Sequence, residues 1–218
     1  MRAITAGVLA LCVAAPTSAG SIAGHVSLSA VRGMDVSFRP YAGRASSLPS
    51  PARPARGRIT DAIVYVEAAP AGTLLAAATH GTPELAQRGQ AFEPRVIVVP
   101  VGGMVTFPNF DPVYHNVFSV SPVRRFDLGK YPRGQSRVVT FTRPGVVNVF
   151  CDIHADMAAF ILVTPTAAWT RATNDGRFEL SGLPAGHYRV SWWHPDLPGG
   201  GTDVDVPAEG AVSLDVEL

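Results

Sequence analysis

Short apolar runs separated by turn residues recur along the chain from Phe92 onward. Each run is four to eight residues long and either alternates with polar residues or is continuously apolar, which is typical of strands. Gly, Pro, Asn or Asp separates the runs, and the first six are 95–101, 104–107, 116–120, 137–141, 146–150 and 158–163. Short strands at this spacing predict an all-β sandwich or barrel.

A second series of runs follows Pro165, and two more lie near the start of the chain. The later runs are 167–171, 177–180, 187–193, 202–206 and 212–217, with a hairpin turn predicted at Asn174-Asp175-Gly176. The early runs are 21–30 and 61–67. Residues 72–90 have no clear pattern, and residues 42–58, rich in Pro, Ser and Arg, predict a mobile excursion.

Composition agrees with a turn-rich β protein. Apolar residues make up 47% of the chain and charged residues only 16%, against about 25% charged in an average domain. The 21 Gly and 19 Pro show no collagen repeat, and no heptad pattern indicates a coiled coil. The 18 basic and 17 acidic residues nearly cancel, so a nucleic-acid partner is not expected.

Residues 1–19 predict a secretory signal peptide. Arg2 supplies the positive charge, an apolar stretch runs from Ile4 to Ala15, and Thr17-Ser18-Ala19 offers a cleavage site. The apolar stretch is too short to span a bilayer, and charged or turn residues interrupt every later candidate. We therefore expect an exported, periplasmic protein without a membrane span.

Charge is unevenly distributed along the chain. Between His115 and Gly145 the only acid is Asp127, against six basic residues, namely Arg124, Arg125, Lys130, Arg133, Arg137 and Arg143. After Thr166 the acids number eight and the basic residues three. Two solvated faces explain this pattern. The alternative is a basic rim that steers an acidic partner.

Cleavage of the signal peptide would leave Cys151 as the single cysteine. A lone thiol in an oxidising compartment is protected by burial or by a metal. Cys151, His154 and Met157 follow a predicted strand at intervals of three residues, and a turn there would bring their donor atoms to one point. His115, at the start of an upstream strand, offers a fourth donor.

Two histidines, a cysteine and a weak axial methionine are the ligand set of a blue-copper electron-transfer site. Each residue alone also fits ordinary packing, and only their joint spacing favours a metal. Zinc is the alternative metal, although methionine is a poor zinc ligand.

At these residues the chain resembles the cupredoxins of the plastocyanin and amicyanin type, including methylamine-utilisation proteins of the periplasm. The resemblance covers about residues 85–165 and is carried by Cys151-x-x-His154-x-x-Met157 and by His115-Asn116. It implies a Greek-key β-barrel with one type 1 copper held by His115, Cys151, His154 and axial Met157. It also implies that Asn116 ties the two ligand loops together and hydrogen-bonds near the thiolate.

The end of the chain, 166–218, resembles the carboxypeptidase regulatory-like, prealbumin-type β-sandwich, a module without catalysis of its own. The resemblance rests on the segments 174–178 and 183–188. Only five strands are predicted there, whereas such sandwiches have about seven. Within residues 20–70, the segments 24–26 and 62–66 match the two missing strands, so we expect the copper domain to be inserted into a split sandwich. In the alternative, sequential layout, these strands complete the barrel.

These features predict an electron carrier rather than an enzyme, because four protein ligands leave no open position for a substrate. The remaining histidines form no His-x-His pair for a second copper centre, and no Gly-x-Ser-x-Gly motif indicates a hydrolase. The expected partner is a redox protein, and an acidic one if the basic rim acts in steering. The alternative function is a copper-binding or adhesive, carbohydrate-binding-like module without a redox role.

Overall fold

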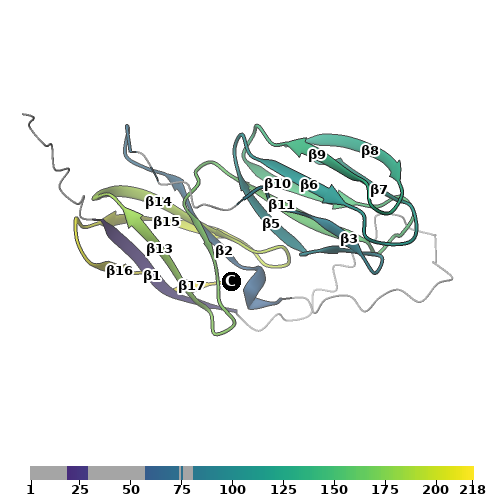
Figure 1. Cartoon of the computed structure of the whole chain (residues 1–218). Helices are drawn as coiled ribbons and strands as arrows, with labels where there is room; N and C mark the ends of the chain where they lie inside the picture. The colour runs from purple at the N-terminus through teal and green to yellow at the C-terminus, as the bar shows by residue number, and fades with distance from the viewer. Residues whose placement is uncertain (1–18, 29–56, 74, 76–80) are drawn as a thin grey trace, which may run out of the picture.

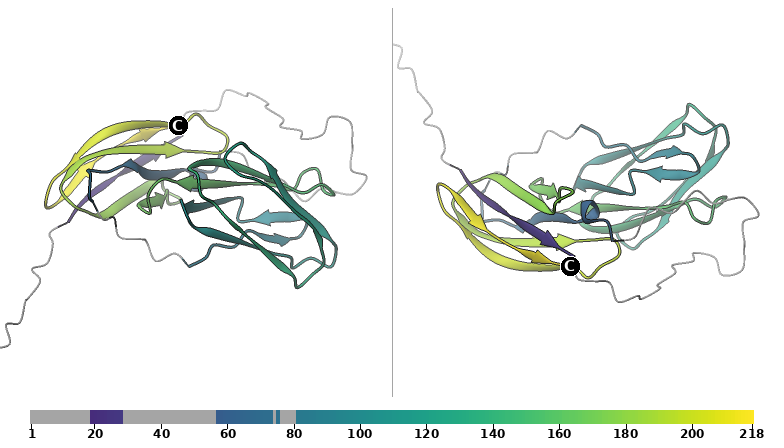
Figure 2. Two further views of the ribbon diagram at one scale, coloured as in Figure 1. Left: turned by 90° about the horizontal axis from the view of Figure 1, so that it is seen from above. Right: turned by 90° about the horizontal axis from the view of Figure 1, so that it is seen from below.

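The computed structural model describes residues 19–28, 57–73, 75 and 81–218. The predicted signal peptide, except its last residue, and all but the end of the 42–58 excursion lie outside them. The described chain folds almost entirely into strands, and its one helical element is the 3-10 turn η1 (Ile59–Asp61). No helix in this part of the chain is both long and apolar enough to cross a membrane. The strands form two units that lie side by side (Figures 1 and 2).

The central unit, residues 81–165, is a Greek-key sandwich. Its strands are β3 (Ala86–Arg88), β4 (Ala91–Glu93), β5 (Val96–Pro100), β6 (Met104–Pro108), β7 (His115–Val120), β8 (Arg125–Tyr131), β9 (Ser136–Thr140), β10 (Gly145–Phe150) and β11 (Ala158–Thr164). One sheet has the order β5-β11-β10-β7-β8, and β6 pairs with β9 opposite it. Strand β10 returns to lie beside β7, which completes the Greek key.

The split unit combines strands from both ends of the chain. They are β1 (Gly20–Ser27), β2 (Ile63–Ala68), β12 (Trp169–Arg171), β13 (Arg177–Leu183), β14 (Gly186–Trp193), β15 (Gly200–Val206), β16 (Ala211–Ser213) and β17 (Val216–Glu217). Strand β1 pairs with β13, β16 and β17, and β2 pairs with β12 and β14. No described residue of β2 pairs with the strands of the central unit.

A close approach of two backbones explains why the run predicted over 212–217 is two strands. A Cβ atom on Gly24 would lie 1.8 Å from the carbonyl oxygen of Leu214, so only glycine fits there. The Leu214 N–H donates to the carbonyl of Ala23 at 3.0 Å. Strands β16 and β17 lie parallel to β1 in the same register, and the strand pairing is interrupted between them, where Leu214 lies against Gly24.

An apolar joint connects the two units. Strands β5 and β11 are buried on both faces, because alternate residues point to the core of the central unit and to the split unit. The joint contains Ile63, Val96, Val98 and Leu162, packed by Tyr65, Val146, Phe160, Trp169 and Trp193. At its rim, Arg95 bonds to Asp61 at 3.1 Å and to Asp196 at 2.7 Å.

Three further segments differ from the sequence prediction. The unpatterned segment 72–90 contains β3, which forms a short hairpin with β4. Strand β8 was not predicted, because a charged residue or glycine occupies four of its seven positions. The strand predicted from Asp61 begins instead at Ile63, since Asp61 ends the 3-10 turn.

Candidate metal centre

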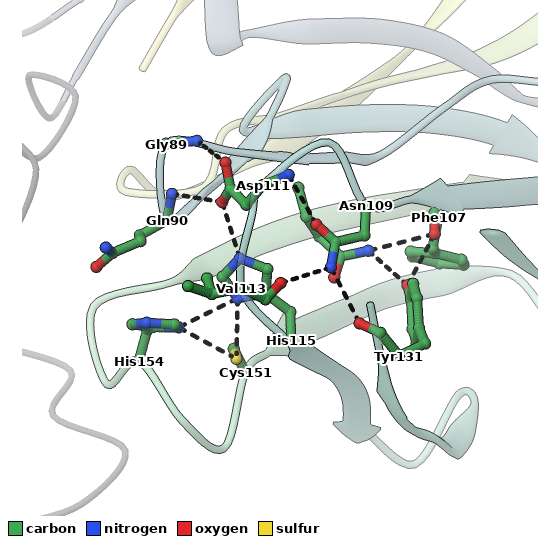
Figure 3. Close-up of polar contacts among 11 residues, drawn as sticks. Gly89, Gln90, Phe107, Asn109, Asp111, Val113, His115, Tyr131, Cys151 and His154 are labelled. Atoms are coloured by element: carbon green, nitrogen blue, oxygen red, sulfur yellow. Dashed lines mark hydrogen bonds and ion pairs between the residues drawn. The ribbon is translucent and has the colours of Figure 1, made fainter. Parts of the chain in front are cut away.

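Three predicted ligands meet at one end of the central unit (Figure 3). The donor atoms of His115, Cys151 and His154 all lie within 4.8 Å of one another. The Cys151 Sγ is 3.9 Å from His115 Nδ1 and 3.8 Å from His154 Nδ1, and the two Nδ1 atoms are 3.1 Å apart. His115 and Cys151 are buried, whereas His154 is partly exposed.

The strand order brings these residues together. His115 begins β7 and Cys151 directly follows β10, and these two strands are neighbours in one sheet. The turn between β10 and β11 carries His154 and is closed by two backbone hydrogen bonds. The Cys151 N–H donates to the Met157 carbonyl at 3.2 Å, and the Met157 N–H donates to the His154 carbonyl at 3.0 Å. The chain thus folds back over the ligand interval, as the sequence predicted.

Asp111 is a functional residue that the sequence analysis missed. Its carboxylate accepts a hydrogen bond from His115 Nε2 at 2.8 Å, which leaves Nδ1 of that ring facing Cys151. The same carboxylate accepts the backbone N–H groups of Gly89 and Gln90, at 2.6 and 2.8 Å, in the turn between β3 and β4. The sequence offered one signal for Asp111, namely a carboxylate four residues before a predicted histidine ligand.

A buried amide holds the loop that carries Asp111. The Asn109 Oδ1 accepts the Asp111 N–H at 2.9 Å. Its Nδ2 donates to the carbonyls of Val113 and Tyr131, at 2.9 and 3.0 Å. Asn109 is 1% exposed, so these bonds form away from solvent. The position of His115 is therefore fixed through Asp111 by a chain of buried hydrogen bonds (Figure 3).

The surroundings of Cys151 lower the pKa of its thiol. Burial alone would raise the pKa of Cys151, but hydrogen bonds from His115 and from the N–H groups of Ile153, His154 and Asn116 outweigh it and lower the pKa. Burial lowers the pKa of His154, and the neighbouring His115 adds to this effect. Burial would also lower the pKa of His115, but its hydrogen bonds to Cys151 and Asp111 outweigh this and raise it. A thiolate and a neutral imidazole are the forms that bind a metal.

The spacing of the three donors fits a single first-row metal ion. Nitrogen and sulfur ligands about 2.0–2.3 Å from such an ion, arranged trigonally, are separated from each other by roughly 3.5–3.8 Å. The sulfur–nitrogen distances of 3.8 and 3.9 Å lie at and just above the upper end of this range, and the 3.1 Å between the nitrogens requires only a small opening.

Met157 and Asn116 complete the set of predicted site residues. Met157 is 1% exposed and packs in the core of the central unit, at the closing bond of the ligand turn. Asn116 directs its backbone N–H to the thiolate, while its side-chain Oδ1 is buried without a hydrogen-bond partner. The backbone of Asn116 thus makes the bond near the thiolate, and Oδ1 makes no bond between the loops.

No protein-family model and no curated protein matches the chain. Among solved structures, it is similar to a purple cupredoxin from Nitrosopumilus maritimus, with 21% identity over 38% of this chain and 99% of that one, at a TM-score of 0.35. A Cu(I) amicyanin mutant has 23% identity over 47% and 98% of the two chains, at a TM-score of 0.36. A copper-containing nitrite reductase from Thermus scotoductus SA-01 has 28% identity over 45% and 25%, at 0.37. The case for a metal centre rests on the site's own geometry.

Proposed function

We propose that this chain is an exported type 1 copper protein of the cupredoxin kind that carries single electrons and is not an enzyme. The observation that carries the proposal is the convergence of two imidazoles and one thiolate within 4.8 Å, at a largely buried end of a β-sandwich. Soft thiolate and thioether ligands favour Cu(I), and imidazole suits copper in both oxidation states. The split unit is proposed as the non-catalytic, prealbumin-type sandwich.

Each residue of the site has a distinct task. Cys151, His115 and His154 would hold the copper, and Met157 would supply the weak axial ligand. The bound ion would supply one-electron chemistry between Cu(I) and Cu(II). Asp111 orients the His115 ring, because its carboxylate fixes Nε2 and leaves Nδ1 for the metal. Burial of His115 and Cys151 excludes water from the thiolate side.

Titration of the purified protein with Cu(II) tests this function. One equivalent should give an intense visible thiolate-to-copper absorption, which Cys151→Ser should abolish. The matched control is Met157→Leu, which should keep the colour and shift the potential because the axial bond is weak. A colourless wild-type protein, or a preference for zinc when both metals are offered, would overturn the assignment.

Redox cycling separates the carrier from a copper-binding or adhesive module. A carrier should be bleached by a reductant and recover its full colour with hexacyanoferrate(III), over repeated cycles. A protein that loses its copper on reduction would instead support the binding module.

A further inference from the structure

Apolar side chains are exposed around the candidate metal site. Eight large apolar residues are exposed in the described chain, and four of them, Phe110, Val113, Tyr114 and Ile153, lie in the loops that carry Asp111 and His154. Tyr114 is 57% exposed and precedes the ligand His115. We call these four residues, together with the partly exposed His154, the metal-end face. Apolar residues clustered at one site mark an interaction surface.

A basic edge borders this face on one side. Strand β8 pairs with β7 so that Tyr131 lies opposite His115, which places Lys130 beside the site. The turn after β8 is bound to Asn109, since the Gly134 N–H donates to the Asn109 carbonyl at 2.8 Å and the Asn109 N–H donates to the Gln135 carbonyl at 2.9 Å. Arg133 in that turn is therefore held next to Phe110.

The guanidinium of Arg137 completes the basic edge. It lies 5.1 Å from the ring centre of Tyr131 and donates to the Ser136 carbonyl and the Gln135 side chain at 3.1 Å. These contacts fix the charge in place without neutralising it. Lys130 has a carboxylate near it, that of Asp152 at 3.8 Å, whereas Arg133 forms no ion pair with any described residue.

The remaining charges of the face are paired or acidic, since Asp152 and Asp156, on either side of His154, are both exposed. Arg88 lies 4.5 Å from the ring centre of Phe110, and its guanidinium has Glu93 at 3.6 Å. Among the described residues, the positive charge of the metal-end face that has no carboxylate partner is therefore concentrated at Arg133 and Arg137, on one side of the face.

Arg124 and Arg125 lie at the other end of the sandwich. Arg125 pairs with Val120, five residues along β7 from His115, a separation of about 17 Å along a strand. The steering charges expected from the sequence as one block from Arg124 to Arg143 are thus divided between two ends of the molecule.

We propose that the metal-end face docks a redox protein whose contact surface is apolar at its centre and carries carboxylates on the side that meets Lys130, Arg133 and Arg137. This inference rests on the proposed electron-transfer function. The apolar centre allows close approach to His154, and the one-sided charge sets the orientation of the partner. Steering of this kind raises association rates roughly 10- to 1,000-fold and weakens with salt.

A redox-inert anion locates the basic edge without any copper. Paramagnetic hexacyanochromate(III), added to the metal-free protein, should broaden the backbone NMR signals of residues 130–137 more than those of residues 120–125. Broadening centred on Arg124 and Arg125 would overturn the assignment of the edge. This measurement stays decisive even if the protein fails to bind copper as proposed.

Two matched double variants test the edge in electron transfer. Arg133→Glu with Arg137→Glu and Arg124→Glu with Arg125→Glu change the net charge equally at opposite ends. In the reaction of the Cu(I) protein with hexacyanoferrate(III), one electron leaves the copper and reduces the iron to hexacyanoferrate(II). The first variant should slow this reaction at least fivefold at low salt, and the second less than twofold. Equal slowing would show that only total charge matters and would overturn the proposal.

The apolar centre is tested by self-exchange between the Cu(I) and Cu(II) forms in high salt, where charge is screened. Val113→Lys with Ile153→Lys should slow self-exchange at least tenfold. The matched variant Val120→Lys with Val138→Lys, at more exposed positions on the strands of the central unit, should leave it within twofold. Equal rates in all three proteins would overturn the docking role of the face.

Discussion

The two units are built from the same kind of strand but treat buried polar groups differently. The core of the split unit, between its two sheets, contains only apolar residues and the ring of Tyr188, whose hydroxyl donates to the Pro184 carbonyl at 2.7 Å. The metal end of the central unit buries five polar side chains, namely Gln87, Asn109, Asp111, His115 and Asn116. Apolar packing is non-directional, whereas a buried hydrogen-bond network fixes positions.

This difference distinguishes the end of the fold that carries the proposed site from the rest of the molecule. The split unit presents a strand face to the joint and contributes packing, with Asp61 and His194 buried beside that joint. The central unit has the same type of apolar core below its site and places five of its eight buried polar side chains at the metal end. A core substitution should therefore change stability, whereas a polar substitution at the metal end should change the site first.

The largest effect is expected at the joint. Leu162→Ala should lower the free energy of unfolding by about 2–5 kcal/mol, because Leu162 is 2% exposed and packs only among apolar residues. The chain's three tryptophans, Trp169, Trp192 and Trp193, all lie in the split unit. Tryptophan fluorescence therefore reports the unfolding of the split unit, and the copper absorption reports the unfolding of the central unit.

In the wild-type protein, the two signals should disappear at the same urea concentration if the joint couples the units. Leu162→Ala should separate the two transitions. The control is Leu180→Ala, which removes the same side chain from the core of the split unit, away from the joint. If Leu180→Ala separates the transitions and Leu162→Ala does not, the joint has no coupling role.

Two features could not be predicted from the sequence: the apolar joint between the units, and the buried hydrogen bonds that position His115 through Asp111. Periodicity identified most strands, and the spacing of residue types identified the donors that the structure brings together. The runs Val96–Val99 and Phe160–Val163 are continuously apolar, which is typical of strands buried on both faces. That signal indicates a second buried face on these strands, but the sequence does not show which segment covers it.

The missed elements have physical reasons of their own. Strands β3 and β4 have three residues each, too few to show a period of two. Their hairpin is defined by tertiary contacts, since its turn donates N–H groups to the carboxylate of Asp111. The role of Asp111 depends on that hairpin, so it could be found only after the fold was known.

The next effect concerns the split unit alone. Gly24→Ala should destabilise the protein by about 1–3 kcal/mol, because the new methyl group would collide with the Leu214 carbonyl and the two backbones would have to move apart. In urea, the tryptophan signal should be lost earlier, with the copper spectrum of the folded protein unchanged. Gly81→Ala is the control for replacing a glycine, because a Cβ atom there would meet nothing within 4 Å and Gly81 is absent from the glycines with positive φ. An altered copper spectrum in Gly24→Ala would contradict the separation of roles.

A similar effect on stability, together with a direct effect on the site, is expected for Asp111→Asn. The amide keeps the shape but replaces one acceptor oxygen, so the bonds to Gly89, Gln90 and His115 cannot all be kept. Loss of such bonds costs about 1–3 kcal/mol. The copper absorption and the potential should shift, because the His115 ring is no longer fixed. Asp127→Asn, at an exposed carboxylate on β8, is the control, and an unchanged spectrum in Asp111→Asn would remove its positioning role.

The smallest expected effect is a pH dependence located at the joint. His194 is 2% exposed, and both ring nitrogens are occupied: Nε2 donates to the Arg58 carbonyl at 3.1 Å, and Nδ1 accepts the Asp196 N–H at 3.0 Å. Burial lowers the pKa of His194, and the charge of Arg95 adds to this. The Arg58 carbonyl and the carboxylates of Asp196 and Asp61 oppose the shift without reversing it.

A histidine with a lowered pKa in the folded state stabilises the protein above its unfolded pKa of about 6.5. As the pH falls below that value, the unfolded chain takes up the proton first, and the stabilisation is lost down to the folded pKa. His194→Gln should remove this part of the pH dependence, because glutamine can make both hydrogen bonds and does not titrate. His187 is the control with the opposite sign: its exposed ring has a raised pKa beside Asp205, so its contribution is lost as the pH rises. Urea unfolding of the copper-loaded protein at pH 7.5 and 5.5 measures both, and a wild-type pH dependence that His194→Gln leaves unchanged would show that this buried histidine does not sense pH.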